Sequence, residues 1–271
     1  MRAMIVIKIG GSLLASGVDG IVRDLAMITA KGVKVIAIHG GAAEVSAMSD
    51  KLGKKPVFIV SPSGVRSRYT DRETVEIYQM VMAGKLNKSL VAMLERVGVE
   101  AIGLCGLDGK LLRAERKKKL LVVDERGRRR MIDGGFTGKP SSVNGALLNA
   151  ILREGYMPVV APIAISEEFG PLNIDSDVAA SSIAIEMRPE VLIFMTNVEG
   201  LMLDGKLVPS ISAAEAEELR PKIGHGMMRK VQAAIEAVSK GIPRAVICNG
   251  RVENPVEKAL SGTGGTVIHD K

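Results

Sequence analysis

Two glycine pairs in this sequence each follow a short apolar run and precede a segment with helical spacing. The first lies in KIGGS, where Lys8 comes just before Gly10 and Gly11, and the second lies in HGGA, with Gly40 and Gly41. Glycine after a strand lets backbone N–H groups approach a ligand closely, and a following helix N-terminus favours an anion. Ligands of open parallel sheets bind beyond the carboxyl ends of the strands. The two turns therefore predict one shared anion site, although glycine pairs also form tight turns that bind nothing.

The second half of the chain adds polar residues that suit the same chemistry. NIDSDVAA begins at Asn173 and opens a helical segment with Asp175 and Asp177, while TNVEGL begins at Thr196 after an apolar run. The acidic residues have a plain alternative role as helix caps. In GHGMMRKVQAA, Lys230 lies in the first turns of a helix, where a cation is unfavourable unless it faces a bound anion. Lys230 is therefore a candidate phosphate-binding residue.

The common nucleotide-binding motifs are missing from the sequence. GGFTGKP, at residues 134–140, resembles a P-loop, but the spacing before Gly138 and Lys139 is too short, and Pro140 stands where Ser or Thr is required. No G-x-G-x-x-G follows a predicted strand. If this protein binds a nucleotide, it uses another arrangement of glycines and lysines.

Six short β-branched runs are predicted to be the strands that position these residues. Their continuously apolar character is typical of a parallel sheet covered on both faces. They are residues 5–9, 33–39, 101–105, 157–163, 190–196 and 245–248. Segments with helical periodicity are residues 72–97, 176–187 and 226–239. The alternation of strands and helices predicts an α/β fold with right-handed crossovers.

The composition describes a chain large enough for a full core. It has 271 residues, of which 46% are apolar and 25% are charged. Apolar runs are interrupted within about ten residues, well short of the roughly twenty that span a bilayer, and no signal peptide is evident. Cys105 and Cys248 are isolated, which is typical of small buried side chains rather than of disulfides or a metal site. We expect a cytoplasmic protein without a membrane partner.

Positive charge is concentrated in one segment. Residues 110–130 contain ten Lys or Arg and three acidic residues, an excess of +7 that equals the formal charge of the whole chain. Apolar and basic runs flank DERG at 124–127, a pattern that predicts a β-hairpin inserted in the α/β fold. A low aromatic content, 3% with no Trp, argues against a stacking surface for single-stranded nucleic acid. A solvated hairpin without a partner is the plain alternative.

Seven motifs occur in an order that resembles the amino acid kinase superfamily, in its acetylglutamate kinase branch. They are KIGGS, HGGA, SRYTD (67–71), the helical segment 71–94, NIDSDVAA, TNVEGL and GMMRKVQAA. Together they cover essentially the whole chain. Within that branch, the chain most resembles the kinases of lysine and arginine biosynthesis whose substrate is 2-aminoadipate or glutamate attached to a small acidic amino-group carrier protein.

The resemblance implies a three-layer α/β/α sandwich with a mainly parallel central sheet, as a single kinase domain over residues 1–271. An N-terminal lobe, about 1–172, would hold the acceptor acid, and a C-terminal lobe, about 173–271, would hold ATP. The activity would be ATP-dependent phosphorylation of a side-chain carboxylate, with Mg²⁺ held mainly by the phosphates and with no all-protein metal site. The resemblance also implies a homodimer, because hexamers of the family usually carry an additional N-terminal helix and this chain starts directly on its first strand.

By motif matching, the resemblance assigns roles to individual residues. Lys8 and Lys230 would be catalytic and flank the transferred phosphoryl group, and Asp177 would hold both lysines. The acceptor would be bound by Gly40, Gly41, Arg68 and Asn173. The phosphates and the nucleotide would be bound by Gly10, Gly11, Thr196, Asn197, Val198 and Gly200.

The chemistry that the resemblance implies needs no general base, because a carboxylate acceptor is already anionic. None of the three histidines, His39, His225 and His269, has to act as one. The requirement is instead to bring an anion to a polyanion and to hold the two in line while charge moves to the bridging oxygen. Two lysines, backbone N–H groups and Mg²⁺ would meet that requirement.

Three positions depart from the acetylglutamate kinase pattern. Ala42 replaces the third glycine of the second turn, Tyr69 replaces an aliphatic residue, and Arg66 adds a positive charge. These departures argue against free N-acetyl-L-glutamate as the acceptor, although an acetylglutamate kinase is the main alternative. A non-catalytic ligand-sensing protein or a nucleic-acid-binding protein is the alternative of another class.

The basic hairpin gives a reason to prefer a carrier-linked substrate, because a free amino acid would not need it. The acidic carrier would contact Lys117, Lys118, Arg128 and Arg129. The hairpin is separate in sequence from both glycine turns and from Lys230, so we expect it to touch a large partner without touching the transferred phosphate. Complementary charge of this kind mainly accelerates association.

Overall fold

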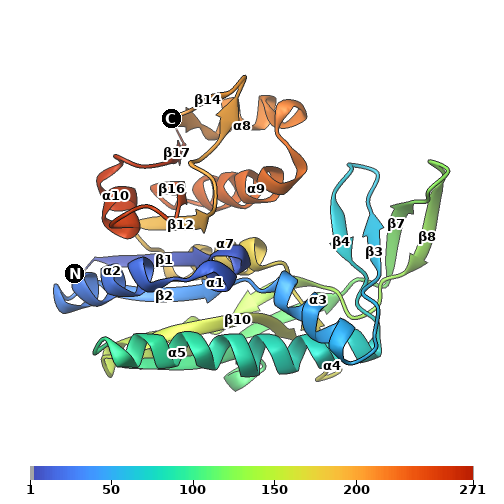
Figure 1. The fold of residues 1–271 in the computed structure, drawn as a ribbon, viewed down its shortest axis with the longest axis horizontal. Coiled ribbons are helices and arrows are strands. Elements are labelled where there is room, and N and C mark those ends of the chain that lie inside the picture. Colours follow the sequence, from blue (N-terminus) through green and yellow to red (C-terminus); the bar gives the residue numbers. More distant parts are fainter. Residues whose placement is uncertain (1–2, 271) are drawn as a thin grey trace.

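The computed structural model describes residues 3–270, apart from the side chain of His225. Its centre is an eleven-stranded sheet with the order β15-β17-β16-β12-β1-β2-β10-β6-β9, and β5 and β11 also pair with β10 (Figure 1). Its strands are β1 (Met4–Ile9), β2 (Lys34–His39), β5 (Ala101–Gly106), β6 (Leu112–Arg116), β9 (Gly138–Val143), β10 (Met157–Ile165), β11 (Pro171–Asn173), β12 (Val191–Thr196), β15 (Ser210–Ser212), β16 (Arg244–Asn249) and β17 (Thr266–His269). All six strands predicted from the sequence are among them.

The middle of this sheet is parallel. The strands β16, β12, β1, β2, β10 and β5 follow one another with parallel pairing. Antiparallel pairs occur where β17, β9 and β11 are added. The prediction of a mainly parallel sheet is therefore confirmed.

Helices cover both faces of the sheet. They are α1 (Gly11–Ser16), α2 (Asp19–Ala30), α3 (Ala42–Lys51), α4 (Arg72–Gln79), α5 (Asn87–Arg96), α6 (Gly145–Arg153), α7 (Ser176–Met187), α8 (Ala213–Glu218), α9 (His225–Ser239) and α10 (Pro255–Ser261), with short 3₁₀ turns at Asp108–Lys110 and Arg220–Lys222. Alternate residues of β1 point to different cores: Val6 packs with α6, α7 and α9, whereas Ile5 and Ile7 pack with α2, α5 and α10. This alternation makes the three layers that the resemblance implies.

The helical segment predicted at 72–97 is continuous but not uniform. Asp71 caps α4 by accepting a hydrogen bond from the Thr74 backbone N–H at 2.8 Å. Between α4 and α5 the chain winds as a π-helix, η1 (Met80–Leu86). Such segments frequently occur at functional sites. Here the wider turn directs Met82 and Leu86 against the second glycine turn, where a Cβ on Gly41 would lie 2.2 Å from the Leu86 side chain.

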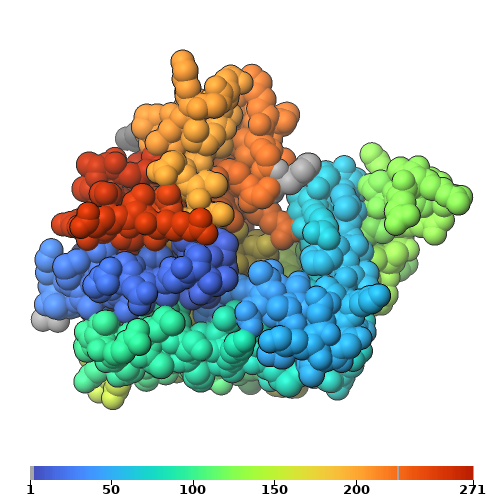
Figure 2. Space-filling model, in the orientation of Figure 1, coloured from blue at the N-terminus to red at the C-terminus, as the bar shows by residue number. Residues whose placement is uncertain are grey.

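A second sheet projects from the body of the molecule (Figure 1). It consists of β3 (Phe58–Val60), β4 (Arg66–Arg68), β7 (Lys119–Val123) and β8 (Arg129–Asp133), in the order β4-β3-β7-β8. The predicted basic hairpin is confirmed as β7–β8, with its turn closed by a 2.9 Å hydrogen bond from the Asp124 N–H to the Arg128 carbonyl. Figure 2 shows the two hairpins as a ridge beside the C-terminal part of the chain.

The remaining features are minor. A two-stranded ribbon, β13 (Met202–Leu203) and β14 (Lys206–Leu207), follows β12. Cys105 and Cys248 are buried free thiols, as the sequence indicated. Among the described residues, no helix combines the length and apolar character needed to cross a bilayer.

Candidate active site

The two glycine turns lie against each other at the carboxyl edge of the sheet. They meet because β1 and β2 are neighbours with parallel pairing. A Cβ on Gly11 would lie 2.6 Å from the Gly41 nitrogen, and a Cβ on Gly40 would lie 2.8 Å from the Gly11 nitrogen. Real side chains do not tolerate such distances, so both turns require glycine. The sequence-based expectation that the two turns come together is confirmed.

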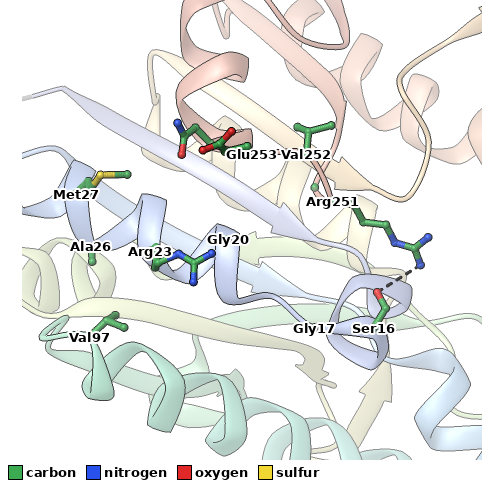
Figure 3. A pocket seen from close by; sticks show the side chains of 12 residues that line it. Ser16, Gly17, Gly20, Arg23, Ala26, Met27, Val97, Arg251, Val252 and Glu253 are labelled. Atoms are coloured by element: carbon green, nitrogen blue, oxygen red, sulfur yellow. Dashed lines mark hydrogen bonds between the residues drawn. The ribbon is translucent and has the colours of Figure 1, made fainter.

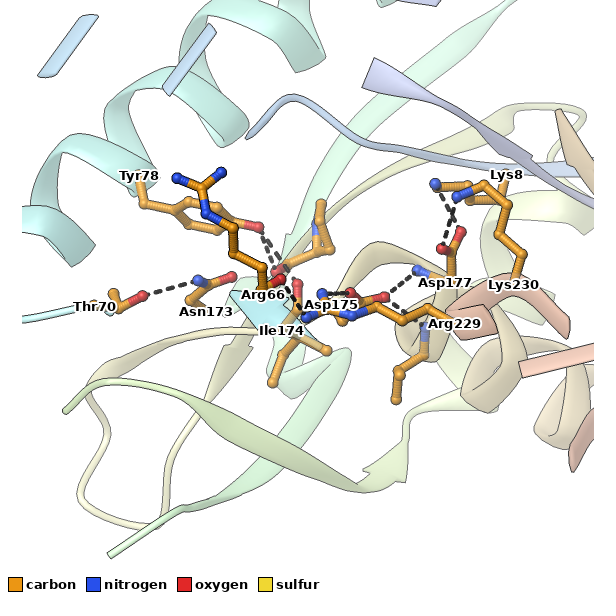
Figure 4. A network of polar contacts seen from close by, with 12 residues as sticks. Lys8, Arg66, Thr70, Tyr78, Asn173, Ile174, Asp175, Asp177, Arg229 and Lys230 are labelled. Carbon is orange, nitrogen blue, oxygen red and sulfur yellow. Dashed lines mark hydrogen bonds and ion pairs between the residues drawn. The ribbon is translucent and has the colours of Figure 1, made fainter. Parts of the chain in front are cut away.

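One buried carboxylate bridges the two candidate catalytic lysines beside these turns. The Lys8 Nζ lies 2.7 Å from Asp177 Oδ1, and the Lys230 Nζ lies 3.2 Å from Asp177 Oδ2 (Figure 4). Lys8 and Asp177 are each only 4% exposed. Burial by itself raises the pKa of the Asp177 carboxyl, but the charges of Lys8 and Lys230 outweigh burial and hold this pKa below its usual value. The cluster therefore carries two positive charges and one negative charge, which leaves a net positive charge for an anionic group.

The start of α7 fixes the position of Asp177. The N-cap residue Asp175 accepts hydrogen bonds through Oδ1 from the Asp177 N–H at 2.9 Å and from the Val178 N–H at 3.3 Å. The capping role that the sequence left open is therefore real for Asp175, whereas Asp177 faces the lysines. Asp175 Oδ2 binds Arg229 Nη1 at 2.7 Å. Sequence reasoning missed Arg229; the available signal was a second cation next to Lys230 in the first turns of α9.

A cavity of about 630 Å³ opens beside this cluster. All four residues assigned to the acceptor, Gly40, Gly41, Arg68 and Asn173, line it. Arg68 Nη2 donates hydrogen bonds to the Ala42 carbonyl at 2.8 Å and to Ser46 Oγ at 2.6 Å. In the described part of the chain, the buried Nη1 of Arg68 has no hydrogen-bond partner. That orphaned donor is suited to a carboxylate that enters the cavity.

Asn173 closes the same side of the cavity. Its Nδ2 donates a hydrogen bond to Thr70 Oγ1 at 2.9 Å, so the side chain is held across 103 positions of sequence. This contact uses only the Nδ2 atom of Asn173, so the amide oxygen Oδ1 lies on the opposite side of the planar amide from Thr70. Asn173 and Arg68 come from different strands, β11 and β4, and only the tertiary structure brings both to one cavity.

The four residues assigned to the nucleotide besides Gly10 and Gly11 lie at or just after the end of β12, which pairs with β1 on the edge opposite β2. Thr196 ends β12, and the Gly10 N–H donates a hydrogen bond to the neighbouring Met195 carbonyl at 3.0 Å. The turn that contains Asn197, Val198 and Gly200 therefore begins next to the first glycine turn. A Cβ on Gly200 would lie 2.6 Å from Thr266 Oγ1, so this turn also requires glycine.

The basic hairpin is nearer to the site than the sequence suggested. Lys117, which precedes β7, and the strand itself line the acceptor cavity. The hairpin is apart from both glycine turns and from Lys230 along the sequence, and in the structure Lys117 lies in the wall of the cavity that Arg68 and Asn173 also line. The reason is that β7 pairs with β3 through Val60 and Val123, which ties this hairpin to the one that carries Arg68. All four residues assigned to carrier contact, Lys117, Lys118, Arg128 and Arg129, are exposed.

A second cavity, of about 790 Å³, lies between α2 and the loop at residues 250–254 (Figure 3). Arg23 and Arg251 project from its walls. Among the described residues that line it, none is a residue that the sequence assigned to the site. The larger volume therefore does not mark the place where the candidate catalytic residues meet.

His39 lies buried beneath the second glycine turn. Its Nδ1 is 3.0 Å from the Gly40 carbonyl, and its Nε2 is 3.3 Å from Asn87 Nδ2. Because Asn87 Nδ2 is a donor, Nε2 accepts and Nδ1 carries the proton that is donated to Gly40. Burial first, and then the nearby charge of Lys8, lower the pKa of His39 to about 4. Both ring nitrogens are therefore committed to structure in a neutral imidazole.

We expect His39→Gln to make stability less sensitive to acid. An unfolded chain binds a proton at His with a pKa of about 6.5, whereas the folded pKa is about 4. The contribution of His39 to the free energy of unfolding is therefore complete above about pH 6.5. As the pH falls from 6.5 towards 4, this contribution is lost, and the free energy of unfolding decreases by roughly 3 kcal/mol. Urea denaturation at pH 7 and pH 4.5 measures this, and an equal loss in wild type and variant would contradict it.

We expect Arg68→Ala to raise the apparent KM for the acceptor acid about tenfold or more and to leave that for ATP nearly unchanged. Arg68 lines the cavity, its buried Nη1 has no hydrogen-bond partner among the described residues, and a hydrogen bond between two charged groups is among the stronger ones. Arg68→Lys should restore little, because an ammonium lacks the planar fork. Steady-state kinetics with each substrate varied in turn measure both constants. A rise confined to the ATP constant would place Arg68 on the wrong side of the site.

The model of the amino acid kinase family matches residues 3–249. This chain belongs to the amino acid kinase family. The motif order quoted above therefore reflects true membership, and the residue roles can be considered within the chemistry of that family.

Relatives of this amino acid kinase match over nearly their whole length. The LysW-aminoadipate/LysW-glutamate kinase proposed for Nitrosopumilus maritimus is 49% identical over 265 residues, 98% of this chain and 99% of the relative. The LysW-aminoadipate/LysW-glutamate kinase of Saccharolobus solfataricus is 44% identical over 266 residues, 98% of this chain and 99% of the relative.

Solved structures of the same fold are more distant in sequence. The N-acetylglutamate synthase of Neisseria gonorrhoeae superposes with a TM-score of 0.82 at 24% identity, over all of this chain and 60% of that one. The carbamate kinase of Giardia lamblia bound to AMP-PNP gives a TM-score of 0.72 at 16% identity, over all of this chain and 99% of that one. These likenesses establish the amino acid kinase fold.

Proposed function

We propose that this kinase transfers the terminal phosphoryl group of ATP to the side-chain carboxylate of 2-aminoadipate or glutamate, while that acid is attached to a small acidic carrier protein. The product is an acyl phosphate of a biosynthetic route to lysine or arginine. The observation that carries the proposal is the pair of lysines on one buried carboxylate, at the place where two glycine turns meet and beside a cavity that Arg68 lines.

The proposed roles follow from the charges. The carboxylate acceptor enters from the cavity and is held by Arg68, Asn173 and the N–H groups of the second glycine turn. ATP lies on the side of Gly10, Gly11 and the turn at residues 196–200. Lys8 and Lys230 face the transferred group between them and stabilise the negative charge that builds on the phosphoryl oxygens. Asp177 holds both lysines, so little reorganisation is required when the charge moves.

No side chain has to remove a proton in this reaction. The acceptor is anionic before the transfer, and His39 is buried, neutral and fully hydrogen-bonded. We propose that Mg²⁺ arrives with the phosphates of ATP, where it keeps several waters and neutralises charge. Among residues 3–270, no group of three or more His, Cys, Asp or Glu side chains is arranged to hold a metal ion.

The carrier-linked form of the acceptor is supported by the shape and charge of the cavity. A cavity of about 630 Å³ falls in the range of roughly 300–1,000 Å³ that accommodates ligands much larger than one amino acid. It continues beneath β7 to Lys117 and Lys139, where an acidic chain would meet positive charge. Relatives at 42–50% identity are named as kinases of LysW-linked aminoadipate and LysW-linked glutamate, which supports the same substrates here.

Two further features belong to this proposal. We assign acceptor binding to an N-terminal lobe, about 1–172, and ATP binding to a C-terminal lobe, about 173–271. We also propose a homodimer. Light scattering gives the mass in solution and tests the dimer directly.

The decisive experiment is a phosphoryl-transfer assay with matched acceptors. Carrier-linked glutamate, carrier-linked 2-aminoadipate and free N-acetyl-L-glutamate are each offered with ATP and Mg²⁺, and the acyl phosphate is trapped with hydroxylamine. We expect a higher kcat/KM for at least one carrier-linked acceptor. Faster turnover of free N-acetyl-L-glutamate would replace the proposal with an acetylglutamate kinase, and no transfer to any of the three would indicate a non-catalytic relative.

A further inference from the structure

Arg229 joins three parts of the site that are far apart in sequence. Its Nη1 lies 2.7 Å from Asp175 Oδ2, and its Nη2 donates a hydrogen bond to the Arg66 carbonyl at 2.9 Å (Figure 4). Asp175 is the N-cap of α7, and Arg66 begins β4 in the projecting sheet. Arg229 itself belongs to α9, one residue before Lys230. The Arg229 side chain is 32% exposed, and the residue lines the cavity that also contains Arg68.

We propose that Arg229 is a positioning residue that couples the hairpin β3–β4 on the acceptor side to the alignment of Lys230. The proposal deepens the proposed phosphoryl transfer and rests on it. One branch of the guanidinium aligns the start of α9 on α7, and the other holds the hairpin that carries Arg68. Binding of the acceptor at Arg68 and placement of Lys230 at the phosphoryl group are thereby linked through one side chain.

The ion pair between Arg229 and Asp175 is a second contact between α9 and α7, next to the ion pair between Lys230 and Asp177. Arg229 and Lys230 are successive residues of α9, and they bind Asp175 and Asp177 at the start of α7. Asp175 also holds the backbone N–H of Asp177 through its other oxygen. If Arg229 is removed, Lys230 therefore keeps its own partner but loses the neighbouring contact that fixes the direction of the helix.

The other contact of Arg229, from Nη2 to the Arg66 carbonyl, is made to a residue whose own side chain is packed within the hairpin. The guanidinium of Arg66 stacks on the Phe58 ring, 3.8 Å from its centroid, so the carbonyl that Arg229 binds belongs to a residue held from both sides. Arg68 follows two positions later on the same strand. A displacement of β4 from α9 would therefore move Arg68 relative to the acceptor.

Arginine is required because the two contacts use two nitrogens of one planar group. A lysine at position 229 supplies one ammonium, which satisfies the Asp175 carboxylate but does not reproduce the fork. Glutamine supplies no charge. Asn at position 175 keeps a side-chain oxygen for the cap but loses the charge that Arg229 binds. These substitutions separate the two branches.

The kinetic test uses Arg229→Lys, Arg229→Gln and Asp175→Asn with the carrier-linked acceptor. We expect Arg229→Lys to raise the acceptor KM about tenfold with kcat nearly unchanged, and Arg229→Gln also to lower kcat about tenfold. Asp175→Asn should lower kcat to a similar extent, and Asp175→Asn/Arg229→Gln should be no slower than the slower single variant. Arg96→Lys and Arg96→Gln, at an exposed ion pair with Asp19, are controls that should change neither constant.

Three outcomes of these measurements would overturn the proposal. If the double variant shows the product of the two single effects, the residues do not act as a unit. If Asp175→Asn lowers the acceptor KM, because a released Arg229 binds the acceptor directly, Arg229 is a substrate ligand rather than a positioning residue. Unchanged kinetic constants with a lowered melting temperature in all three variants would assign Arg229 a purely structural role.

Hydrogen exchange tests the coupling without any activity. Arg229→Lys should accelerate exchange of the backbone amides of residues 58–68 several-fold and leave the start of α7 at the wild-type rate, whereas Arg229→Gln should accelerate both. Equal exchange in wild type and Arg229→Lys would refute the branch to the hairpin. If wild type transfers no phosphoryl group but the exchange pattern is as expected, the proposed function fails while the mechanical link stands.

Discussion

Replacing Lys8 or Lys230 by Ala is expected to lower turnover at least about a hundredfold while changing ATP affinity little. Each lysine is one of two cations held on Asp177 beside the turns assigned to the phosphates. Such a preorganised group stabilises the charge that develops in the transition state more than the charge of the bound substrate. The loss of one donor of this kind typically costs about 3–4 kcal/mol of barrier. Single-turnover rates and ATP titrations of the same variants measure the two quantities separately.

The design of this experiment has to separate catalysis from folding. Removing Lys8 leaves the buried Asp177 with one cation, and breaking a buried pair destabilises a protein by roughly 3–5 kcal/mol. Lys230 is more exposed, at 16% of its side chain against 5% for Lys8, so Lys230→Ala should lose less stability than Lys8→Ala. Circular dichroism at the assay temperature confirms that both variants are folded. Near-normal turnover in either folded variant would refute the two-lysine mechanism.

Reversing the charge of Lys118, Arg128 and Arg129 to Glu is expected to slow association with an acidic carrier by about 10- to 1,000-fold. Activity with any small free acid that the enzyme accepts should be unchanged. The three side chains are exposed on the projecting sheet, and exposed charges act mainly on the rate of association and on its salt dependence. Stopped-flow association at low and high salt measures both, and salt should remove much of the wild-type advantage.

Lys117 has to be tested apart from the other three, because the structure places it in the wall of the cavity. Lys117→Glu should impair the free acid as well as the carrier-linked acid. A control with the same change of net charge reverses Lys31, Arg96 and Lys240, which are exposed and lie outside both hairpins. If that control slows association as much as the hairpin variant does, the slower association results from the change in net charge and not from a contact at the hairpin. If the hairpin variant impairs neither substrate, the carrier surface is elsewhere.

The sequence by itself determined the strands, the main helices and the chemistry of the turns. These features depend on local rules. Apolar β-branched runs form buried strands wherever they occur, and a glycine pair after such a run makes a turn with accessible N–H groups. Even the meeting of the two glycine turns followed from the sequence, because neighbouring parallel strands end at one edge. Lys8 and Lys230 were also identifiable, since their position relative to these elements is fixed locally.

Only the tertiary structure decided which residues share the site. The contacts of Arg229 span 54 positions to Asp175 and 163 positions to Arg66, and no periodicity in the sequence encodes pairs at such separations. The π-helical turn against Gly41 and the place of β7 in the wall of the cavity likewise depend on packing between distant segments. At the first place the local sequence favoured an ordinary helix, and tertiary packing overrode that preference, because burying apolar side chains together stabilises the fold by more than the local helix preference is worth. At the second place the hairpin formed as predicted, but its pairing with β3 joins distant segments and has no local signal.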